Sequence, residues 1–281
     1  MKLAKTYPIR LLCRLHCVPR SSLYYEPAPT PDDDLYKSTL LRLAAEFPTY
    51  GYRRLTVMLR RSGCTGVNSK RVRRWMDELN LTASPPARKT RTTNSRHNFP
   101  RYDNLVKDLE ILCPDHVWVA DITYIRLKRE FVYLAVIMDV FTRSIRGWHL
   151  SRDLDQSLTL AALDKALVIT TPQVHHSDQG VQYAATAYVE RLKRLGVTLS
   201  MAAIGEPREN GFAERLMRTI KEEEVDRSEY HDLADALRQI GHFIDAVYNI
   251  KRIHSALGYL TPREFEEKWT GAYKSATTKS T

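Results

Sequence analysis

The sequence predicts an α/β fold, in which a mixed sheet with flanking helices follows a helical N-terminal region. Apolar residues recur at helical spacing through the first 81 residues. From residue 117 onward, short apolar runs rich in β-formers are interspersed with helical segments. Neither pattern occurs between them. We therefore expect a helical region at 1–81, a basic linker at 82–104, a core at 105–228 and a C-terminal helical extension at 229–281.

The helical region divides into two groups of helices. Residues 7–25 favour two short helices, and residues 35–80 favour three more. The second of these three runs from about Tyr52 to Arg61 and stops at a Ser-Gly pair. The third begins with Asn68 or Ser69 as its cap.

The last of these helices has a cationic outer face. Opposite its apolar stripe stand Lys70, Arg71, Arg73 and Arg74. A helix, a short Gly-containing turn and a second helix with such a face form a helix-turn-helix-like module, and the second helix fits the major groove of DNA. The alternative is a solvated basic face, which is common on helices. The cationic segments on either side favour DNA contact by these four residues.

Positive charge is concentrated in the first third of the chain. Residues 1–104 contain 20 Lys and Arg against 8 Asp and Glu, whereas residues 105–281 contain 23 against 25. An electropositive front on a near-neutral body implies a polyanionic partner, most commonly DNA or RNA. The linker adds to this charge, and we expect Arg88, Lys89 and Arg91 to contact DNA.

Several classes of protein are excluded by composition. No apolar run approaches the roughly 18 residues that span a bilayer, so we expect no membrane segment. Arg10, Arg14 and His16 interrupt the first apolar stretch, which does not fit a secretory signal. The four cysteines are too scattered for a disulfide framework. We expect a cytoplasmic protein with reduced thiols.

The core follows the element order β-β-β-α-β-α-β-α, and we expect its first three strands to be antiparallel. This order is that of an RNase H-like mixed sheet. In chain order, the expected elements are strands at 117–125, 131–140 and 144–150, a helix at 158–167, a strand at 174–176, a helix at 183–195, a strand at 197–201 and a helix at about 210–227.

Three carboxylates stand out by their positions. Asp121 lies inside the first apolar strand, Asp178 directly follows the fourth strand, and Glu214 begins the last core helix. Burying an unpaired charge is costly, so these positions need a compensating partner. In an RNase H-like sheet the first and fourth strands are neighbours, which brings the carboxylates together. Such a group binds hard divalent cations, and two of these stabilise the attacking and leaving oxygens of a phosphoryl displacement.

The helix of Glu214 also carries two cations. Lys221 follows seven residues later on almost the same stripe, and Arg218 lies at i+4. We expect both cations to contact DNA phosphates while Glu214 binds metal. An ordinary surface ion pair between Glu214 and Arg218 is the alternative. The two aspartates elsewhere in the core favour the metal site.

Three blocks of the core resemble the catalytic blocks of the retroviral-integrase-type DDE core. They read WVADITY at 118–124, HSDQGVQY at 176–183 and NGFAERLMRTIK at 210–221. In particular they resemble the second-frame product (OrfB) of the insertion-sequence-three family of bacterial transposases. Segments at 50–54, 67–72 and 248–262 resemble the same family, so the resemblance covers nearly the whole chain.

The resemblance implies a transposase that cleaves 3′ ends at insertion-sequence termini and transfers the strands to other DNA. Asp121, Asp178 and Glu214 would hold two Mg²⁺ ions per active site, with Mn²⁺ as a substitute. The implied partners are terminal repeats, target DNA, further copies of the chain on paired ends, and the first-frame product (OrfA) or a fusion with it. The implied location is the bacterial nucleoid. A nuclease of the same fold without strand transfer, and a catalytically decayed DNA-binding protein, remain alternatives.

Two departures from the family pattern are visible. Glu209 stands where the family often has Asp ahead of the catalytic helix. The chain also shows no sustained heptad repeat, and it lacks the helix-turn-helix and leucine zipper of the first-frame product. We therefore expect full recognition of transposon ends to need that partner.

Overall fold

A computed structural model describes residues 7–24, 33–81, 102–203 and 207–278. The chain divides into two compact units, one formed by 1–47 with 55–81 and the other by 48–54 with 82–281. Most of the predicted linker, with Arg88, Lys89 and Arg91, lies outside the described residues. The boundaries at 81, 104 and 228 therefore stay predictions. In the described parts of the chain, no helix is both long and apolar enough to cross a membrane.

The helical unit contains the helices that the periodicity predicts. They are α1 (Ile9–Leu15), α2 (Arg20–Leu23), α3 (Asp33–Glu46), α4 (Tyr52–Arg61) and α5 (Ser69–Glu78). Each of the last three has apolar side chains that are fully buried, because helical spacing places them on one face of the helix. These include Leu40, Leu43, Leu55, Leu59, Val72 and Trp75.

The cap of α5 is Asn68 rather than Ser69. The Asn68 side-chain oxygen accepts a hydrogen bond of 2.8 Å from the backbone N–H of Arg71. This bond satisfies one of the backbone donors that a helix start leaves without an intrahelical partner.

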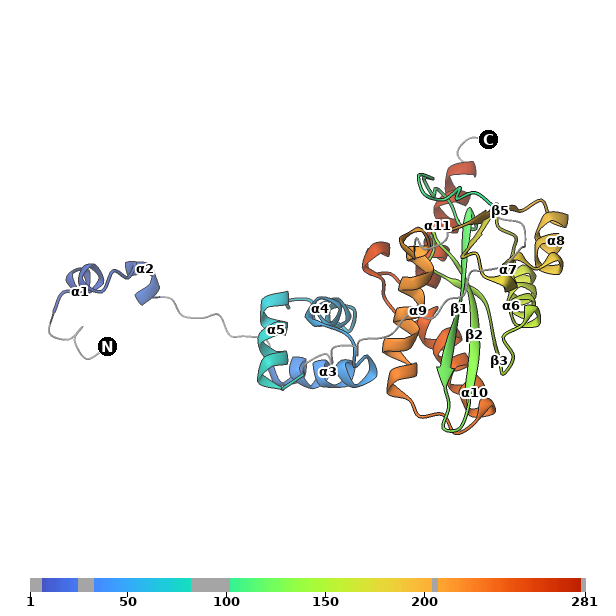
Figure 1. Cartoon of the computed structure of the whole chain (residues 1–281). Helices are drawn as coiled ribbons and strands as arrows, with labels where there is room; N and C mark the ends of the chain where they lie inside the picture. The colour runs from blue at the N-terminus through green and yellow to red at the C-terminus, as the bar shows by residue number, and fades with distance from the viewer. Residues whose placement is uncertain (1–6, 25–32, 82–101, 204–206, 279–281) are drawn as a thin grey trace. The chain divides into compact units, whose positions relative to one another are not determined.

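The second unit is built on a five-stranded sheet with the order β3-β2-β1-β4-β5 (Figure 1). β1 with β2 and β2 with β3 are antiparallel, whereas β1 with β4 and β4 with β5 are parallel. The predicted mixed sheet and its antiparallel first three strands are confirmed. The strands are β1 (Val117–Arg126), β2 (Phe131–Asp139), β3 (Ile145–Ser151), β4 (Val174–Ser177) and β5 (Thr198–Met201).

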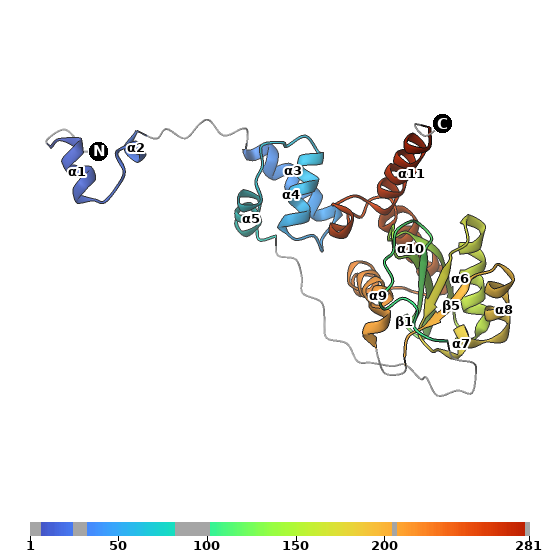
Figure 2. The same cartoon turned by 90° about the horizontal axis from the view of Figure 1, so that it is seen from above.

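Helices cover both faces of the sheet. α9 (Gly211–Glu223) lies on one face, and α6 (Gln156–Ile169) and α8 (Thr186–Arg194) lie on the other (Figures 1 and 2). β1 contributes side chains to the hydrophobic cores on both faces of the sheet, because successive side chains of a strand point to opposite faces. Val117 and Val119 pack in the cluster that contains residues of α9, and Trp118 and Ala120 pack in the cluster that contains residues of α6 and α8.

Two helices differ from the sequence prediction. The helix expected at 183–195 is two helices, α7 (Val181–Ala184) and α8, because the backbone of Ala185 is extended (φ −60°, ψ 137°). On either side of this break the rings of Tyr183 and Tyr188 meet edge-to-face, with centroids 5.5 Å apart. The last core helix ends at Glu223, and a 3₁₀ turn (η3, Val225–Arg227) follows it.

The C-terminal extension shares the hydrophobic core of the second unit. It consists of α10 (Leu233–His242), a π-helical segment (η4, Phe243–Tyr248), a 3₁₀ turn (η5, Ser255–Leu257) and α11 (Pro262–Thr278). Asn249 binds β3 directly. Its side chain accepts from the Ile145 N–H at 2.9 Å and donates to the Ile145 carbonyl at 3.1 Å. The extension is therefore joined to the sheet by backbone recognition as well as by apolar packing.

Candidate active site

The parallel pairing of β1 and β4 places two of the three predicted carboxylates side by side. The last residue pair in register is Ala120 with Ser177. Asp121 and Asp178 each come one residue later, on strands that lie about 4.8 Å apart. The neighbourhood expected from the strand order is present in the structure.

Asp121 lies at the point where β1 and β4 stop pairing. β4 pairs with β1 only over residues 117–120, so in the described part of the chain the remaining edge of β1 has no strand partner. The Asp121 side chain is half-buried there. Its Oδ1 accepts a hydrogen bond of 2.8 Å from the N–H of Ile122. At this position the backbone of Asp121 is held in the sheet, while its carboxylate stays accessible from solvent.

Asp178 is oriented by the turn that follows β4. Its Oδ1 accepts from the backbone N–H of Gly180 at 3.0 Å. A Cβ added to Gly180 would lie 2.9 Å from the same oxygen. The turn therefore both holds the carboxylate and requires a residue without a side chain next to it.

The start of α9, the helix that carries Glu214, is bonded to the strands of the two aspartates. Asn210 donates from Nδ2 to the Ala120 carbonyl at 3.3 Å, next to Asp121. The ring of His176 in β4 bridges the Ser200 hydroxyl, at 2.8 Å, and the Glu209 carbonyl, at 3.1 Å. A hydrogen-bonded structural role is the one that the sequence favours for His176, whereas nothing in the sequence pattern indicates the bond of Asn210. Glu214 itself is exposed in the first turn of α9.

Glu209, which stands where the family often has Asp, connects two segments of the core. Its Oε2 accepts a hydrogen bond of 2.7 Å from the N–H of Ala203, which follows β5. This backbone bond is the main reason why the pKa of Glu209 lies below its ordinary value. Glu209 therefore joins the segment after β5 to the segment before α9. Glu214, not Glu209, is the acidic residue in the first turn of α9.

The electrostatics of Asp121 show that the three acids are coupled. The pKa of Asp121 is raised from 3.8 to about 7, mainly by burial and also by the nearby charges of Asp178 and Glu214, while the Ile122 N–H and Lys221 act in the opposite direction. Burial also raises the pKa of Tyr183 well above 10, with contributions from Asp121 and Asp178. A group of like charges that resists ionisation is a site that a cation would stabilise.

The structure does not gather the acids into a ready-made cage. Among the residues it describes, no three His, Cys, Asp or Glu side chains stand close enough together to hold a metal ion. The donor set nevertheless fits Mg²⁺, because carboxylate oxygens are the ligands that hard cations prefer. The metal assignment of Asp121, Asp178 and Glu214 remains a prediction.

The cations of α9 differ in their surroundings. Arg218 is exposed and forms no ion pair with Glu214 in the described structure, contrary to the alternative of an i, i+4 surface pair. Lys221 is half-buried, and its Nζ lies 4.7 Å from the ring centroid of Tyr124. Both remain candidates for phosphate contact.

Three of the four predicted DNA-contacting residues of α5 are exposed. Lys70, Arg73 and Arg74 face solvent, and Arg74 also forms an ion pair with Glu78 at 3.4 Å. Arg71 is used within its own unit. Its guanidinium pairs with Asp33 and lies 4.8 Å from the ring centroid of Trp75. The basic face available to a partner is thus narrower than the sequence pattern indicated.

Comparison with known families and relatives covers most of the chain. Two integrase core domain families match residues 112–207 and 195–262, and an HTH-like domain family matches residues 31–89. The transposase of IS629 from Shigella sonnei is 33% identical over 283 residues, which cover 95% of this chain and 94% of the relative. The chain belongs to the insertion-sequence-three family of transposases.

Other relatives agree with this assignment. The transposase is 32% identical to a 31 kDa protein of insertion element IS600 from Shigella sonnei, over 92% of this chain and 98% of the relative. It is 29% identical to the transposase InsK of IS150 from Escherichia coli, over 95% and 96%. The catalytic core of HTLV-2 integrase, solved with magnesium, is 18% identical over 55% of this chain and 98% of that chain, with a TM-score of 0.44. The family predicted from the three sequence blocks is confirmed by the sequence relatives.

Gly180 provides a test of how closely Asp178 must be placed. Gly180→Ala keeps an ordinary backbone conformation, but its Cβ displaces the Asp178 carboxylate. Because the displaced atom is the end of a side chain, we expect thermal stability within about 0.5 kcal/mol of wild type. A displaced ligand weakens activity strongly, and we expect Mg²⁺-dependent cleavage to fall roughly ten- to a hundredfold. A Mg²⁺ titration of the cleavage rate measures this, and unchanged rates at every Mg²⁺ concentration would show that Asp178 needs no such placement.

Proposed function

We propose that this transposase cleaves 3′ ends at the termini of its insertion sequence and joins the freed 3′ hydroxyl to another phosphodiester. Asp121, Asp178 and Glu214 are the catalytic carboxylates of this proposal. The observation that carries it is the position of Asp121 and Asp178 side by side, each one residue past the last paired residues of the parallel strands β1 and β4, with the charge of Glu214 acting on Asp121.

The three carboxylates would hold two Mg²⁺ ions, or Mn²⁺ in their place. When bound, such ions lower the pKa of water and neutralise charge on the reacting phosphate. The raised pKa of Asp121 supports this role, since the group is costly to ionise without a counter-charge. The Gly180 N–H holds the Asp178 carboxylate in place through its Oδ1, which supports its proposed role as a ligand.

The remaining residues of the site position DNA. Arg218 and Lys221, on the helix of Glu214, would bind phosphates of the strand being cut. Asn210 and His176 keep the start of that helix on the sheet. Tyr183 is not a nucleophile in this proposal, because its buried hydroxyl holds its proton at working pH. The chemistry therefore needs no covalent bond between protein and DNA.

The proposed activity also implies binding partners. We propose that the HTH-like domain binds terminal DNA, that two or more copies assemble on paired ends, and that the first-frame product, or a fusion with it, completes end recognition. Family membership and the HTH-like match support DNA as the partner.

A cleavage and joining assay tests the function. Labelled terminal DNA is incubated with Mg²⁺ and either wild type or Glu214→Gln, with and without the first-frame partner. We expect cut and joined strands from wild type and neither from the variant. Cut strands without joined ones would favour the nuclease alternative. An inert wild type, even with the partner, would favour a decayed DNA-binding protein.

The basic face of α5 gives a prediction about DNA binding. Lys70, Arg73 and Arg74 replaced together by Gln should flatten the dependence of binding on salt, because each lost phosphate contact removes about 0.9 from the log–log slope. We expect the slope to fall by roughly 2 to 3. Fluorescence anisotropy of a duplex between about 50 and 200 mM salt measures it.

A control of equal charge change separates this effect from net charge. The last turn of α8 also carries three cations, Arg191, Lys193 and Arg194. Their replacement by Gln should leave the salt slope within experimental error. If the two triple variants lower the slope equally, α5 has no special role in DNA contact.

A further inference from the structure

Two exposed aromatic rings lie beyond Asp121 on the open edge of the sheet. Tyr124 on β1 is 37% exposed, and Phe131 at the start of β2 is 52% exposed. Their rings meet edge-to-face, with centroids 6.0 Å apart. A pair of large exposed rings in contact indicates a binding surface rather than scattered surface residues.

The strand register explains why these rings are uncovered. In the β1–β2 pairing Tyr124 stands opposite Tyr133, and Arg126 stands opposite Phe131. Even-numbered residues of β1 and odd-numbered residues of β2 thus share the sheet face on which α6 lies. The cluster on that face takes in Trp118 and Ala120 but neither exposed ring. On the other edge of β1, pairing with β4 ends at Ala120, and past that residue no strand of the described structure covers this edge.

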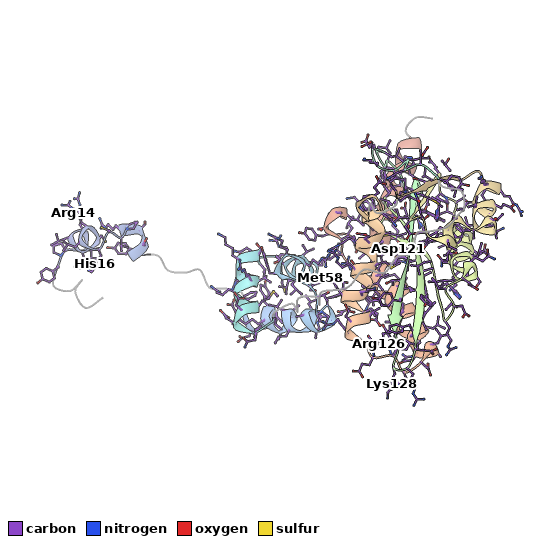
Figure 3. All side chains as sticks on the ribbon, in the orientation of Figure 1. Arg14, His16, Met58, Asp121, Arg126 and Lys128 are labelled. Atoms are coloured by element: carbon purple, nitrogen blue, oxygen red, sulfur yellow. The ribbon has the colours of Figure 1, made fainter. Side chains whose placement is uncertain are left out.

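Cations surround the two rings. The Lys221 Nζ lies 4.7 Å from the Tyr124 centroid, and the Arg126 guanidinium carbon lies 5.9 Å from the Phe131 centroid. Lys128 and Arg129 in the β1–β2 turn are exposed as well. Asp121, Arg126 and Lys128 follow one another along β1 toward that turn (Figure 3). We call this surface the hairpin platform; it comprises Tyr124, Arg126, Lys128, Arg129, Phe131 and Lys221.

Glu130, the acid of the β1–β2 turn, is already engaged by a cation. Glu130 accepts from both the Nε and the Nη2 of Arg152, at 2.9 Å and 3.1 Å. Its charge is therefore partly neutralised by a residue outside the hairpin platform. Arg126, Lys128 and Arg129 face solvent and Lys221 is half-buried against the Tyr124 ring, so cations alternate with aromatic rings, which is the composition of surfaces that bind unpaired nucleic acid.

We infer that the hairpin platform binds an unpaired stretch of the DNA strand next to the reacting phosphate. This inference rests on the proposed function. Tyr124 lies three strand residues beyond Asp121, roughly 10 Å at the usual rise per residue, and the two side chains point to opposite faces of the sheet. Lys221 joins the two regions at the open edge of β1, because its charge acts on Asp121 and its Nζ lies 4.7 Å from the Tyr124 ring centroid. A strand bound in the active site can therefore pass over this edge to the ring. Bases of a duplex are stacked on each other, whereas an unpaired base offers its face to a ring. Stacking on Tyr124 and Phe131 would hold the bases while the cations bind phosphates.

Binding in EDTA tests this inference without any catalysis. The probe is a short single-stranded oligonucleotide that contains 2-aminopurine, whose fluorescence falls when it stacks. We expect Tyr124→Ser with Phe131→Ser to weaken single-strand binding by roughly tenfold for each ring and to abolish the fluorescence change. Tyr124→Phe, which keeps the ring, should behave as wild type. Binding of a blunt duplex of the same length should be unchanged.

Two results would overturn the inference. One is an equal loss of single-strand binding in Tyr124→Phe and Tyr124→Ser, because the ring face would then be irrelevant. The other is wild-type single-strand binding and fluorescence by the double serine variant. Thermal unfolding checks the fold, which exposed rings should not affect. Glu214→Gln should retain full single-strand binding, so loss of the hairpin platform and loss of the proposed chemistry are measured separately.

Discussion

Asp121→Asn is expected to abolish Mg²⁺-dependent cleavage and joining of transposon-end DNA, by at least about a thousandfold. The change keeps the size of the side chain and its bond from the Ile122 N–H, but it removes the charge that would hold a cation between β1 and β4. A thousandfold loss corresponds to about 4 kcal/mol of transition-state stabilisation. Single-turnover rates on labelled terminal DNA measure it, since they separate chemistry from product release.

The same substitution should make the metal-free protein more stable at alkaline pH. The pKa of Asp121 is raised to about 7 in the folded protein, against an ordinary value of 3.8. An unfolded chain releases this proton above about pH 4, while the folded chain retains it until about pH 7. Stability is therefore lost as pH rises from 4 to 7 in wild type, and Asn avoids this loss. We expect Asp121→Asn to unfold with roughly 1 to 4 kcal/mol more free energy at pH 8 in EDTA, with a smaller difference at pH 5.

Opposite changes in activity and stability distinguish a functional carboxylate from a structural one. Asp164→Asn is a matched control, because Asp164 is exposed on α6 and pairs only with Arg191 at the surface. It should change neither cleavage nor unfolding by more than about 1 kcal/mol. If Asp121→Asn keeps its activity, or loses activity together with stability, the assignment of Asp121 as a metal ligand fails.

The strands and their order along the chain could be predicted because buried strands appear in the sequence as short apolar runs. Apolar runs of strand length, separated by short turns, indicate β1, β2 and β3, and the run before Asp178 indicates β4. The neighbourhood of Asp121 and Asp178 was expected because this order is that of an RNase H-like sheet, in which the first and fourth strands are neighbours. Each of these inferences depends on residues close together in the chain.

Contacts between distant residues leave no such pattern in the sequence. Asn210 and Ala120 are 90 positions apart, and nothing in their local patterns indicates the bond that places the start of α9. Arg71 has the pattern of an exposed cation, yet Asp33 and Trp75 on the same unit engage it. The break at Ala185 likewise depends on buried rings rather than on a helix-breaking residue. Tertiary packing overrides local propensity at these positions.

Gly147→Ala is expected to be among the most destabilising single-methyl changes in this protein. β3 approaches α6 so closely at Gly147 that a Cβ would lie 2.2 Å from the Ala162 carbonyl oxygen and 2.8 Å from the Ala166 backbone nitrogen. These are backbone atoms of a buried helix, so they cannot turn aside as a side chain can. Overpacking of this kind typically costs 1 to 3 kcal/mol, and we expect about 3 kcal/mol or more here. Urea unfolding measures the change.

Gly271→Ala makes the same chemical change in open space. Nothing lies within 4 Å of a Cβ at Gly271, which is part of α11. Alanine favours a helix over glycine by up to about 1 kcal/mol, so this variant should equal or exceed wild type in stability. The opposite signs test the contact itself rather than the loss of a glycine. If Gly147→Ala unfolds at the wild-type urea concentration, β3 and α6 are not in backbone contact. The packing of α6 against the sheet, which supports β2 and its partner β1 with Asp121, would then have to depend on other contacts.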